Sequence, residues 1–292
     1  MRVDLGHLEV LLTVVDEGSF DGAAATLRVS PSAVSQRIKA LEHQAGQVLL
    51  RRTKPVSATD AAVPYLQAAR QIRAVVEQTI HYVPHEQNTL PTIPLAANSD
   101  SLETWLIPAL GSVKDVARFQ LFRDDQDHTA DLLRAGTVMA GITSTQEPVQ
   151  GCESHRLGIM RYLPISSIDF AKEWFKQGIV EHSFAHAPVL LFDRKDSLQN
   201  AYLRNLDFPH LTPPRNYIPS NGAFLEAIKQ DLGWGMIPEV QVVDSLESGE
   251  LMHLGGHIDV TLYWQQWKLS SEPLDALRQA VSEAAAYSLR IA

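Results

Sequence analysis

The chain has 292 residues, a formal net charge of −9, and a composition that is 45% hydrophobic and 20% charged. These values are typical of a globular protein large enough for two domains; they exclude a disordered chain and argue against non-specific nucleic-acid binding by the whole molecule. No apolar run approaches the roughly 18 residues of a membrane helix, and acidic residues interrupt the apolar N-terminus, so we predict no membrane span and no signal peptide.

The first sixty residues predict three helices. Leucines at helical spacing predict an amphipathic helix that ends at Gly18, and Ser19 can cap a second helix. The four-residue turn RVSP leads to the third helix, with Ser30 as its N-cap and Pro31 at its first position. A helix, a tight turn and a second helix form the helix-turn-helix arrangement.

The third predicted helix, SPSAVSQRIKALE, has two different faces. Val34, Ile38 and Leu41 form one apolar stripe and predict its buried side. Short hydroxyls, an amide and cations occupy the opposite side, where a surface helix usually has long residues that favour helix. Serine is a poor helix former, so we infer that something other than solubility placed these residues.

Residues 47–60, QVLLRRTKPVSATD, predict a wing, a small hairpin that places cations beside the third helix. Residues 22–59 have a local balance of +5, because Glu42 is opposed by six cations: Arg28, Arg37, Lys39, Arg51, Arg52 and Lys54. A short basic segment in an acidic chain is the electrostatic footprint of a focused nucleic-acid contact.

From residue 60 to about residue 82 the sequence is again helical, with apolar residues on more than one side. We interpret this segment as a linker helix that also dimerises. Pro64 fits only within its first turn, because an interior proline costs about 3 kcal/mol. The predicted domains are a DNA-binding domain over 1–59, a linker and dimerisation helix over 60–88, and an effector-binding domain over 89–292.

Strand and helix patterns alternate after residue 90, which predicts parallel βαβ units and an α/β domain. The expected strands are 92–97, 118–122, 138–143, 188–192, 234–239 and 260–269. The expected helices are 101–110, 127–136, 222–233 and 273–290. This domain has room for two lobes, lobe I over about 91–163 and 266–292 and lobe II over about 164–265.

Residues 19–53 resemble the winged helix-turn-helix of the LysR-type transcriptional regulators. The markers are Phe20, Ala23–Ala24, Leu27, the helix 30–42, Gly46 and Leu49–Arg51. The stretches ANSDSLETWLIPAL, DLGWGMIPE and LYWQQWKL are similar to the LysG/ArgP branch. The chain departs from the family pattern at SATDAA, residues 57–62, and at Pro64, both in the first turn of the linker.

The resemblance implies an all-α winged helix-turn-helix domain and a linker helix, followed by a two-lobed α/β effector domain like that of periplasmic binding proteins. It also implies a regulator that senses L-lysine or L-arginine and controls transcription of an amino-acid exporter gene. No cofactor beyond the amino-acid effector is expected. The expected partners are double-stranded promoter DNA and a second copy, as homodimer or homotetramer, with RNA polymerase as a further candidate.

In a winged helix-turn-helix the third helix enters the major groove, where Gln36 can bind the N6/N7 edge of adenine. The residues expected to face bases or the adjacent backbone are Ser30, Pro31, Ser32, Ser35, Gln36 and Lys39. The residues expected to bind phosphates are Arg37, Arg51, Arg52 and Lys54. The alternative for the helix alone is a solvated surface beside a cluster of charges, but the capped turn, the wing and the basic segment together favour DNA binding.

Polar residues follow the predicted strands, at the sheet edge where α/β domains bind ligands. The candidate effector residues are Asn98, Ser99, Asp100, Ser101, Asp124, Asp125, Thr143 and Ser220. Serines and amides at a helix start suit a ligand carboxylate, and a buried ammonium needs an acidic partner. Asp100 and Ser101 can instead be helix caps, the two later aspartates can be solvated loop acids, and Trp105 is expected in the core.

Other chemistry has weaker signals. His182 and His186 are four residues apart, but no third ligand has a convincing spacing, so we predict no metal site. The single cysteine, Cys152, excludes an internal disulfide and is expected to be a small buried apolar group. These features favour a cytoplasmic protein that is not an enzyme. The alternatives are an amino-acid-binding module without DNA function, and a metabolic enzyme with a fused helical domain.

Overall fold

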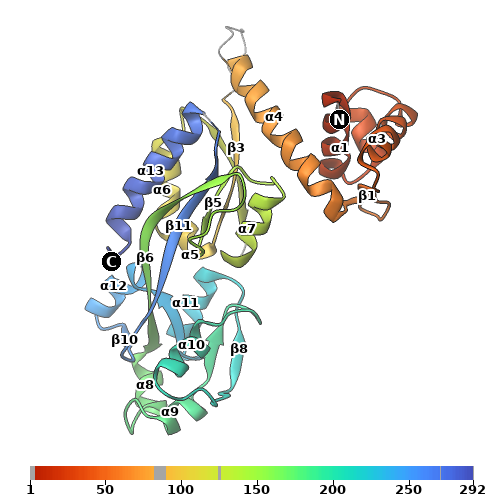
Figure 1. Cartoon of the computed structure of the whole chain (residues 1–292). Coiled ribbons are helices and arrows are strands. Elements are labelled where there is room, and N and C mark those ends of the chain that lie inside the picture. Colours follow the sequence, from red (N-terminus) through yellow and green to blue (C-terminus); the bar gives the residue numbers. More distant parts are fainter. Residues whose placement is uncertain (1–3, 82–89, 124–125, 270, 292) are drawn as a thin grey trace.

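A computed structural model describes residues 4–81, 90–123, 126–269 and 271–291. Figure 1 shows a small N-terminal domain, a long helix α4 that leads away from it, and a larger domain with two lobes, one above the other. The larger domain is a mixed α/β structure, and the predicted fold class is therefore confirmed. The predictions for Asp124 and Asp125 and for linker residues 82–88 lie outside the described residues.

The N-terminal domain has three helices and a short hairpin. Its elements are α1 (Leu5–Glu17), α2 (Phe20–Thr26), α3 (Pro31–Ala45) and the antiparallel strands β1 (Leu50–Arg51) and β2 (Ser57–Ala58). The predicted ends are confirmed, because the Ser19 and Ser30 side chains cap α2 and α3. Gly18 and Gly46 end α1 and α3 with positive φ, which a glycine adopts without strain.

The linker begins with a 3-10 turn, η1 (Asp60–Ala62), and continues as α4 (Val63–His81). Pro64 is the second residue of α4, where its missing amide proton leaves no helical hydrogen bond unmade. Ala62, Leu66 and Ala69 are buried in the core of the N-terminal domain. The first turns of α4 are therefore part of that domain's packing.

The larger domain has nine strands and ten helical segments among the described residues. The strands are β3 (Thr92–Ala97), β4 (Arg118–Arg123), β5 (Ala140–Thr143), β6 (Cys152–Ser167), β7 (Val189–Leu191), β8 (Arg215–Tyr217), β9 (Gly235–Pro238), β10 (Leu251–His253) and β11 (Ile258–Trp267). The helical segments are α5 (Ser99–Ser101), the π-helical η2 (Leu102–Leu106), α6 (Ile107–Ser112), α7 (Gln126–Arg134), α8 (Ile168–Trp174), α9 (Glu181–His186), α10 (Leu198–Asn205), α11 (Asn221–Lys229), α12 (Glu239–Glu247) and α13 (Glu272–Ser288).

The main sheet has the order β10-β6-β11-β5-β3-β4, and β9 pairs with β6 outside this path. β3 is parallel to β4 and β5, and β7 is parallel to β8, as the alternating pattern predicts. β6 and β11 are antiparallel to each other, and β11 is also antiparallel to β5. The expectation of parallel units is therefore wrong for β6 and β11, which extend from one lobe into the other (Figure 1), and also for β9 and β10, which both pair antiparallel with β6.

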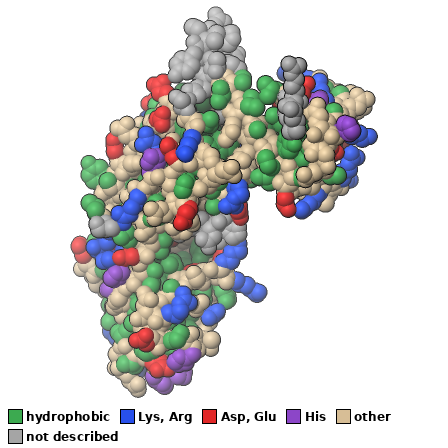
Figure 2. All heavy atoms as spheres, viewed as in Figure 1, with side chains coloured by type: hydrophobic (Ala, Val, Ile, Leu, Met, Phe, Trp, Pro, Cys, Tyr) green, Lys and Arg blue, Asp and Glu red, His purple; other side chains and the backbone are tan. Residues whose placement is uncertain are grey.

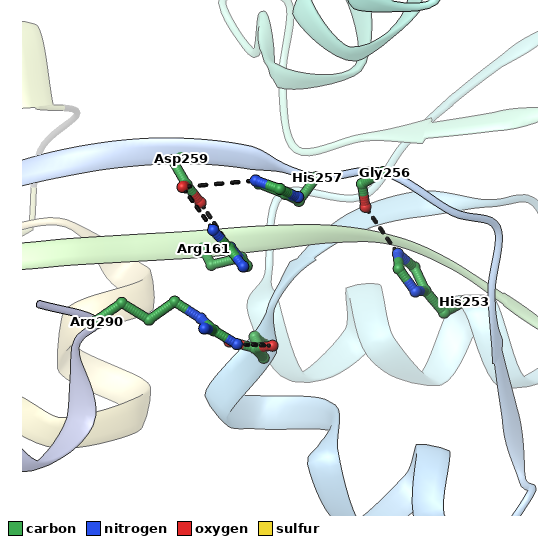
Figure 3. Close-up of polar contacts among 7 residues, drawn as sticks. Arg161, His253, Gly256, His257, Asp259 and Arg290 are labelled. Atoms are coloured by element: carbon green, nitrogen blue, oxygen red, sulfur yellow. Dashed lines mark hydrogen bonds and ion pairs between the residues drawn. The ribbon is translucent and has the colours of Figure 1, made fainter. Parts of the chain in front are cut away.

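Ion pairs lie where β6, β11 and the C-terminal segment meet (Figure 3). Arg161 of β6 donates from Nε and Nη2 to the two carboxylate oxygens of Asp259 on β11, both at 2.8 Å. Arg290, beyond α13, donates in the same way to Glu239 at the start of α12, at 2.7 and 2.8 Å. These bonds hold the pKa of Asp259 and of Glu239 below the usual range, and the second pair ties the C-terminal segment to α12.

The structure also bears on the remaining expectations. Cys152 is 2% exposed and Trp105 lies in the main core, as predicted. The described residues include no candidate membrane-spanning helix. His186 Nδ1 lies 2.9 Å from the carbonyl of His182, and no cluster of three potential metal ligands occurs within the described ranges.

Candidate functional site

The third helix of the N-terminal domain, α3, presents the polar face that its sequence predicts. Val34, Ile38 and Leu41 are at most 1% exposed and hold the helix against the core. Gln36 and Lys39 are exposed on the other side. Since α1 and α2 both pack against α3, the helix is fixed on its apolar side and open on its polar side.

Most of the predicted DNA-contacting residues are exposed: Ser30, Pro31, Ser32, Gln36, Arg37, Lys39, Arg51, Arg52 and Lys54. Ser35 is half-buried. The Ser30 hydroxyl accepts from the Ala33 amide at 3.2 Å and lies 2.9 Å from the Ser32 hydroxyl. Two small side chains at the helix start are thus held close to the backbone, which leaves room for a duplex to approach.

The cations beside α3 face solvent. Within the described residues, no ion pair engages Arg37, Lys39, Arg51, Arg52 or Lys54. The Arg52 guanidinium lies over the Phe20 ring, 5.5 Å from its centroid, a cation–π contact that orients it. Figure 2 shows Lys and Arg side chains along the outer edge of this domain. Exposed, unpaired cations of this kind suit a polyanion such as the phosphate backbone.

The second candidate site is a cavity of about 370 Å³ between the two lobes. This volume falls within the roughly 300–1,000 Å³ of small-molecule pockets. Its polar lining comes from both lobes: Asn98, Ser99, Asp100 and Ser144 on one side, and Asp193, Lys195, Asp196, Ser197, Asn221 and Gln241 on the other. Tyr162 of β6 and Val260 of β11, on the strands that join the lobes, complete the enclosure.

Asp100 is the central acidic group of this cavity. Its Oδ2 accepts from the Tyr162 hydroxyl at 2.6 Å, and its Oδ1 accepts from the Asn221 amide at 2.9 Å. Burial raises the pKa of Asp100 to about 6, and the Asp196 carboxylate adds to the rise, while the hydroxyl and amide donors oppose it. The two side chains that hydrogen-bond to Asp100 are both neutral. The carboxylate therefore lies in a site where a ligand cation would be stabilising.

Asp196, which the sequence did not suggest, adds a second carboxylate from the other lobe. It accepts from the amides of Phe192 and Leu198 at 2.9 and 3.2 Å and from Gln199 Nε2 at 3.1 Å. These bonds organise its loop, yet burial still raises the pKa of Asp196. Its only sequence signal is the charged stretch DRKDS, which looks like a solvated loop.

The predicted effector residues divide into three groups. Asn98, Ser99 and Asp100 line the cavity. Ser101, Thr143 and Ser220 are not part of its lining, although their chain neighbours Ser144 and Asn221 are; Asp124 and Asp125 lie outside the described residues. Thr143 instead accepts a hydrogen bond from Gln265 of β11 and donates one to the Thr145 carbonyl. At the end of β5, strand alternation explains why Ser144 rather than Thr143 lines the cavity, because consecutive side chains of a strand point to opposite faces.

Asn98 combines a structural role with an unmet hydrogen bond. Its Oδ1 accepts from the Ser101 amide at 3.3 Å and caps the first turn after β3. Its Nδ2 is buried and has no partner among the described residues. A buried amide donor without a partner is unfavourable by about 1–3 kcal/mol, which a ligand oxygen in the cavity would relieve. On lobe I, the cavity thus has a hydrogen-bond donor for a ligand carboxylate. Both lobes contribute carboxylates that can pair with ligand cations.

Two protein-family models match this chain. Residues 5–63 match the family model for the bacterial regulatory helix-turn-helix protein, lysR family, and residues 87–286 match the LysR substrate binding domain. The first match contains α3 and the hairpin, and the second contains every residue that lines the cavity.

Individual proteins are similar over the full chain. LysG of Corynebacterium glutamicum, a lysine export transcriptional regulatory protein, is 40% identical over 288 residues, which are 97% of this chain and 98% of the relative. The crystal structure of ArgP from Mycobacterium tuberculosis has a TM-score of 0.93 at 38% identity and covers 100% of both chains. Full-length LysG from C. glutamicum with bound effector Arg has a TM-score of 0.84 at 38% identity, over 99% of this chain and 100% of the other.

Proposed function

The chain belongs to the LysR family of DNA-binding transcriptional regulators, in its LysG/ArgP branch, and we propose that it senses a basic amino acid and controls an amino-acid exporter gene. The effector in this proposal is L-arginine or L-lysine. The family consists of regulators rather than enzymes, and its members combine a helix-turn-helix with a ligand domain. Neither an isolated amino-acid-binding module nor an enzyme accounts for both halves of the chain.

The position of Asp100 is the observation that carries the proposal. A carboxylate that lines the cavity, whose pKa is raised by burial and whose two hydrogen-bond donors are neutral, suits a ligand ammonium or guanidinium. Asp196 supplies a second negative charge, and the unpartnered Asn98 amide supplies a donor for a ligand carboxylate. The similar C. glutamicum structure with bound effector Arg supports a ligand of this class.

The effector part of the proposal is tested by calorimetric titration of the full-length protein with arginine, lysine and citrulline. Citrulline has nearly the shape of arginine but a neutral side chain. We expect binding of arginine or lysine and much weaker binding of citrulline. Equal affinity for arginine and citrulline would contradict recognition of a side-chain cation. Gel-shift titration of the chain's own upstream DNA, with and without ligand, tests the regulatory part.

The proposal assigns base contacts to α3 and phosphate contacts to the wing cations. Gln36→Ala is expected to weaken binding to the operator by about 1–3 kcal/mol and to relax preference at one base pair, because glutamine can form two hydrogen bonds with adenine. The measurement is a titration against operators mutated one base pair at a time. Gln44→Ala, an exposed glutamine two turns further along α3, is the matched control and should change little. Equal losses on every sequence would contradict base reading by Gln36.

Effector affinity is expected to rise with pH through about 6. The bound cation requires ionised Asp100, whose pKa is about 6 without ligand, so binding in acid must first release a proton. The ligand's own side-chain cation does not titrate in this range. Effector affinity should fall up to tenfold per pH unit below about 6 and level off above about 7. Because Asp100 and Asp196 interact, the midpoint of this change reports the titration of the pair and not of Asp100 alone. Calorimetry from pH 5 to 8 checks this, and constant affinity would contradict it.

The proposed assembly is at least a homodimer, and a homotetramer is the larger alternative. Two recognition helices need two half-sites related by a two-fold axis, which one chain does not provide. A regulator of promoter DNA acts beside the chromosome, so we propose a cytoplasmic location and RNA polymerase as a further partner.

A further inference from the structure

The helix α4 belongs physically to the DNA-binding domain. Leu66 and Ala69 are buried in that domain's core, and α4 packs along α1, which in turn packs against α3. The first turns of α4, α1 and α3 therefore form one packed unit. A displacement of this part of α4 therefore also moves α3, because closely packed side chains connect the two helices through α1.

Arg70 joins this unit to the effector domain. Its Nη2 lies 3.1 Å from Oδ1 of Asp16 on α1, and its Nη1 donates to the carbonyl of Ala135 at 2.7 Å. Ala135 follows the last residue of α7, where a helix carbonyl lacks a partner within the helix and a cation is favoured. The Arg70 side chain is only 12% exposed, so one guanidinium spans both domains in a nearly buried position.

A close backbone approach surrounds this hydrogen bond. Gly136 has φ of 69°, and a Cβ added there would lie 2.9 Å from the Trp267 ring and 3.2 Å from the Cα of Gln67 on α4. The turn after α7 is therefore held between α4 on one side and the effector-domain core on the other. There is no space for a side chain, and a shift of this turn must move one of its neighbours.

The same helix α7 packs on strands that lead to the effector cavity. Its Thr129 lies against β5 and β3: a Cβ at Gly141 would meet Thr129 Cγ2 at 2.6 Å and the Ala96 carbonyl at 3.1 Å. The residues directly beyond these strands, Asn98 and Ser144, line the cavity. A continuous packed path thus runs from the cavity through β3, β5 and α7 to Arg70.

We propose that Arg70 is a positioning residue that couples the ligand state of the effector cavity to the DNA-binding domain. The two Nη groups of its guanidinium bind the turn after α7 and Asp16 of α1, and so hold that turn at a fixed distance from α1. A displacement of α7 therefore moves α1, and with it α3. This inference rests on the proposed function and adds the residue through which regulation acts. Arg73 is the natural comparison, because it contacts the same Asp16 at 3.5 Å, is 52% exposed and, within the described ranges, has no hydrogen bond or ion pair with the effector domain.

The test measures coupling in the full-length protein. Promoter affinity is determined with and without saturating arginine, and arginine affinity with and without promoter DNA, for wild type, Arg70→Ala, Arg70→Lys and Arg73→Ala. The coupling factor is the ratio of the affinity for one ligand with the other ligand bound to its affinity without it. By thermodynamic linkage, the ratio for promoter DNA equals the ratio for arginine, and such factors are typically about 5–150-fold. We expect Arg70→Ala to reduce this factor below roughly 2. Its arginine affinity without DNA should stay within about threefold of wild type, as expected of a residue outside the cavity.

The conservative and control variants separate coupling from a merely structural role. Arg70→Lys keeps the charge but presents a single ammonium, which lacks the fork needed for two partners, so an intermediate factor is expected. Arg73→Ala should retain the wild-type factor. A wild-type factor in both Arg70 variants, or an equal loss in Arg73→Ala, would overturn the inference while leaving the proposed function intact. If arginine and promoter DNA show no coupling in the wild-type protein, both the inference and the proposed function are overturned. If Arg70→Ala does not fold, the coupling factor of Arg70→Lys decides.

Discussion

Asp100→Asn is expected to weaken arginine binding by about 3 kcal/mol, roughly 100-fold, because it removes one partner of a buried ion pair. Asparagine has nearly the same volume and can still accept a hydrogen bond from Tyr162, so the cavity keeps its shape. Calorimetric titration at pH 7.5 with arginine, lysine and citrulline measures the effect. The loss should be large for the two cationic ligands and small for citrulline.

The same variant should not be less stable than wild type without ligand. Burial raises the pKa of Asp100, which means that the ionised carboxylate is disfavoured in the folded, ligand-free protein at neutral pH. A thermal melt without ligand therefore separates a binding defect from unfolding. Glu103→Gln is the matched control, since Glu103 acts on the pKa of Asp100 from the adjoining segment η2 but does not line the cavity. Unchanged arginine affinity in Asp100→Asn would remove this residue from the effector site.

The N-terminal domain was predictable because its signals are local. The spacing of Val34, Ile38 and Leu41, the caps Ser19 and Ser30, and the glycines that end α1 and α3 all act within a few residues. Helix periodicity and capping report on neighbours in sequence, and these neighbours are also neighbours in space.

The long strand β6 was missed for the opposite reason. After the buried Cys152, residues 153–157 are all partly or fully exposed, residues 158–162 alternate between buried and partly buried, and residues 162–167 are buried throughout. The strand leaves one lobe and enters the other, so no single periodicity describes it. Its antiparallel pairing with β11 joins segments about a hundred residues apart, which no local pattern encodes.

The effector site was predictable only where its lining comes from the turn between a strand and the next helix on lobe I. Asn98, Ser99 and Asp100 follow a buried strand, a position with a known tendency to face ligands. Asp196 and Asn221 reach the cavity because the second lobe folds over the first, and Ser144 rather than Thr143 does so because of strand alternation. Arg70 looks like a solvated cation on a helix until the fold brings the Ala135 carbonyl, 65 residues later, to its guanidinium.

Removal of both wing arginines should have a comparably large effect on DNA binding. The variant Arg51→Ala, Arg52→Ala is expected to weaken promoter binding by about 3 kcal/mol, roughly 100-fold, because hydrogen bonds with charged groups each contribute about 1.5–3 kcal/mol. Both residues are exposed beside α3, and the Phe20 ring orients the Arg52 guanidinium. The loss should be similar on all sequences, since phosphates carry no base identity.

The salt dependence identifies the mechanism of this loss. Each phosphate contact that disappears should flatten the plot of log affinity against log salt by roughly 0.9, because fewer counterions are released on binding. Titrations from 50 to 200 mM salt measure the slope. Arg204→Ala, which removes one exposed cation from α10 in the second lobe, controls for the loss of a surface cation away from the DNA and should leave the slope unaltered. A double variant with the wild-type slope would mean that neither wing arginine binds phosphate, and the duplex would then have to contact α3 from a different side.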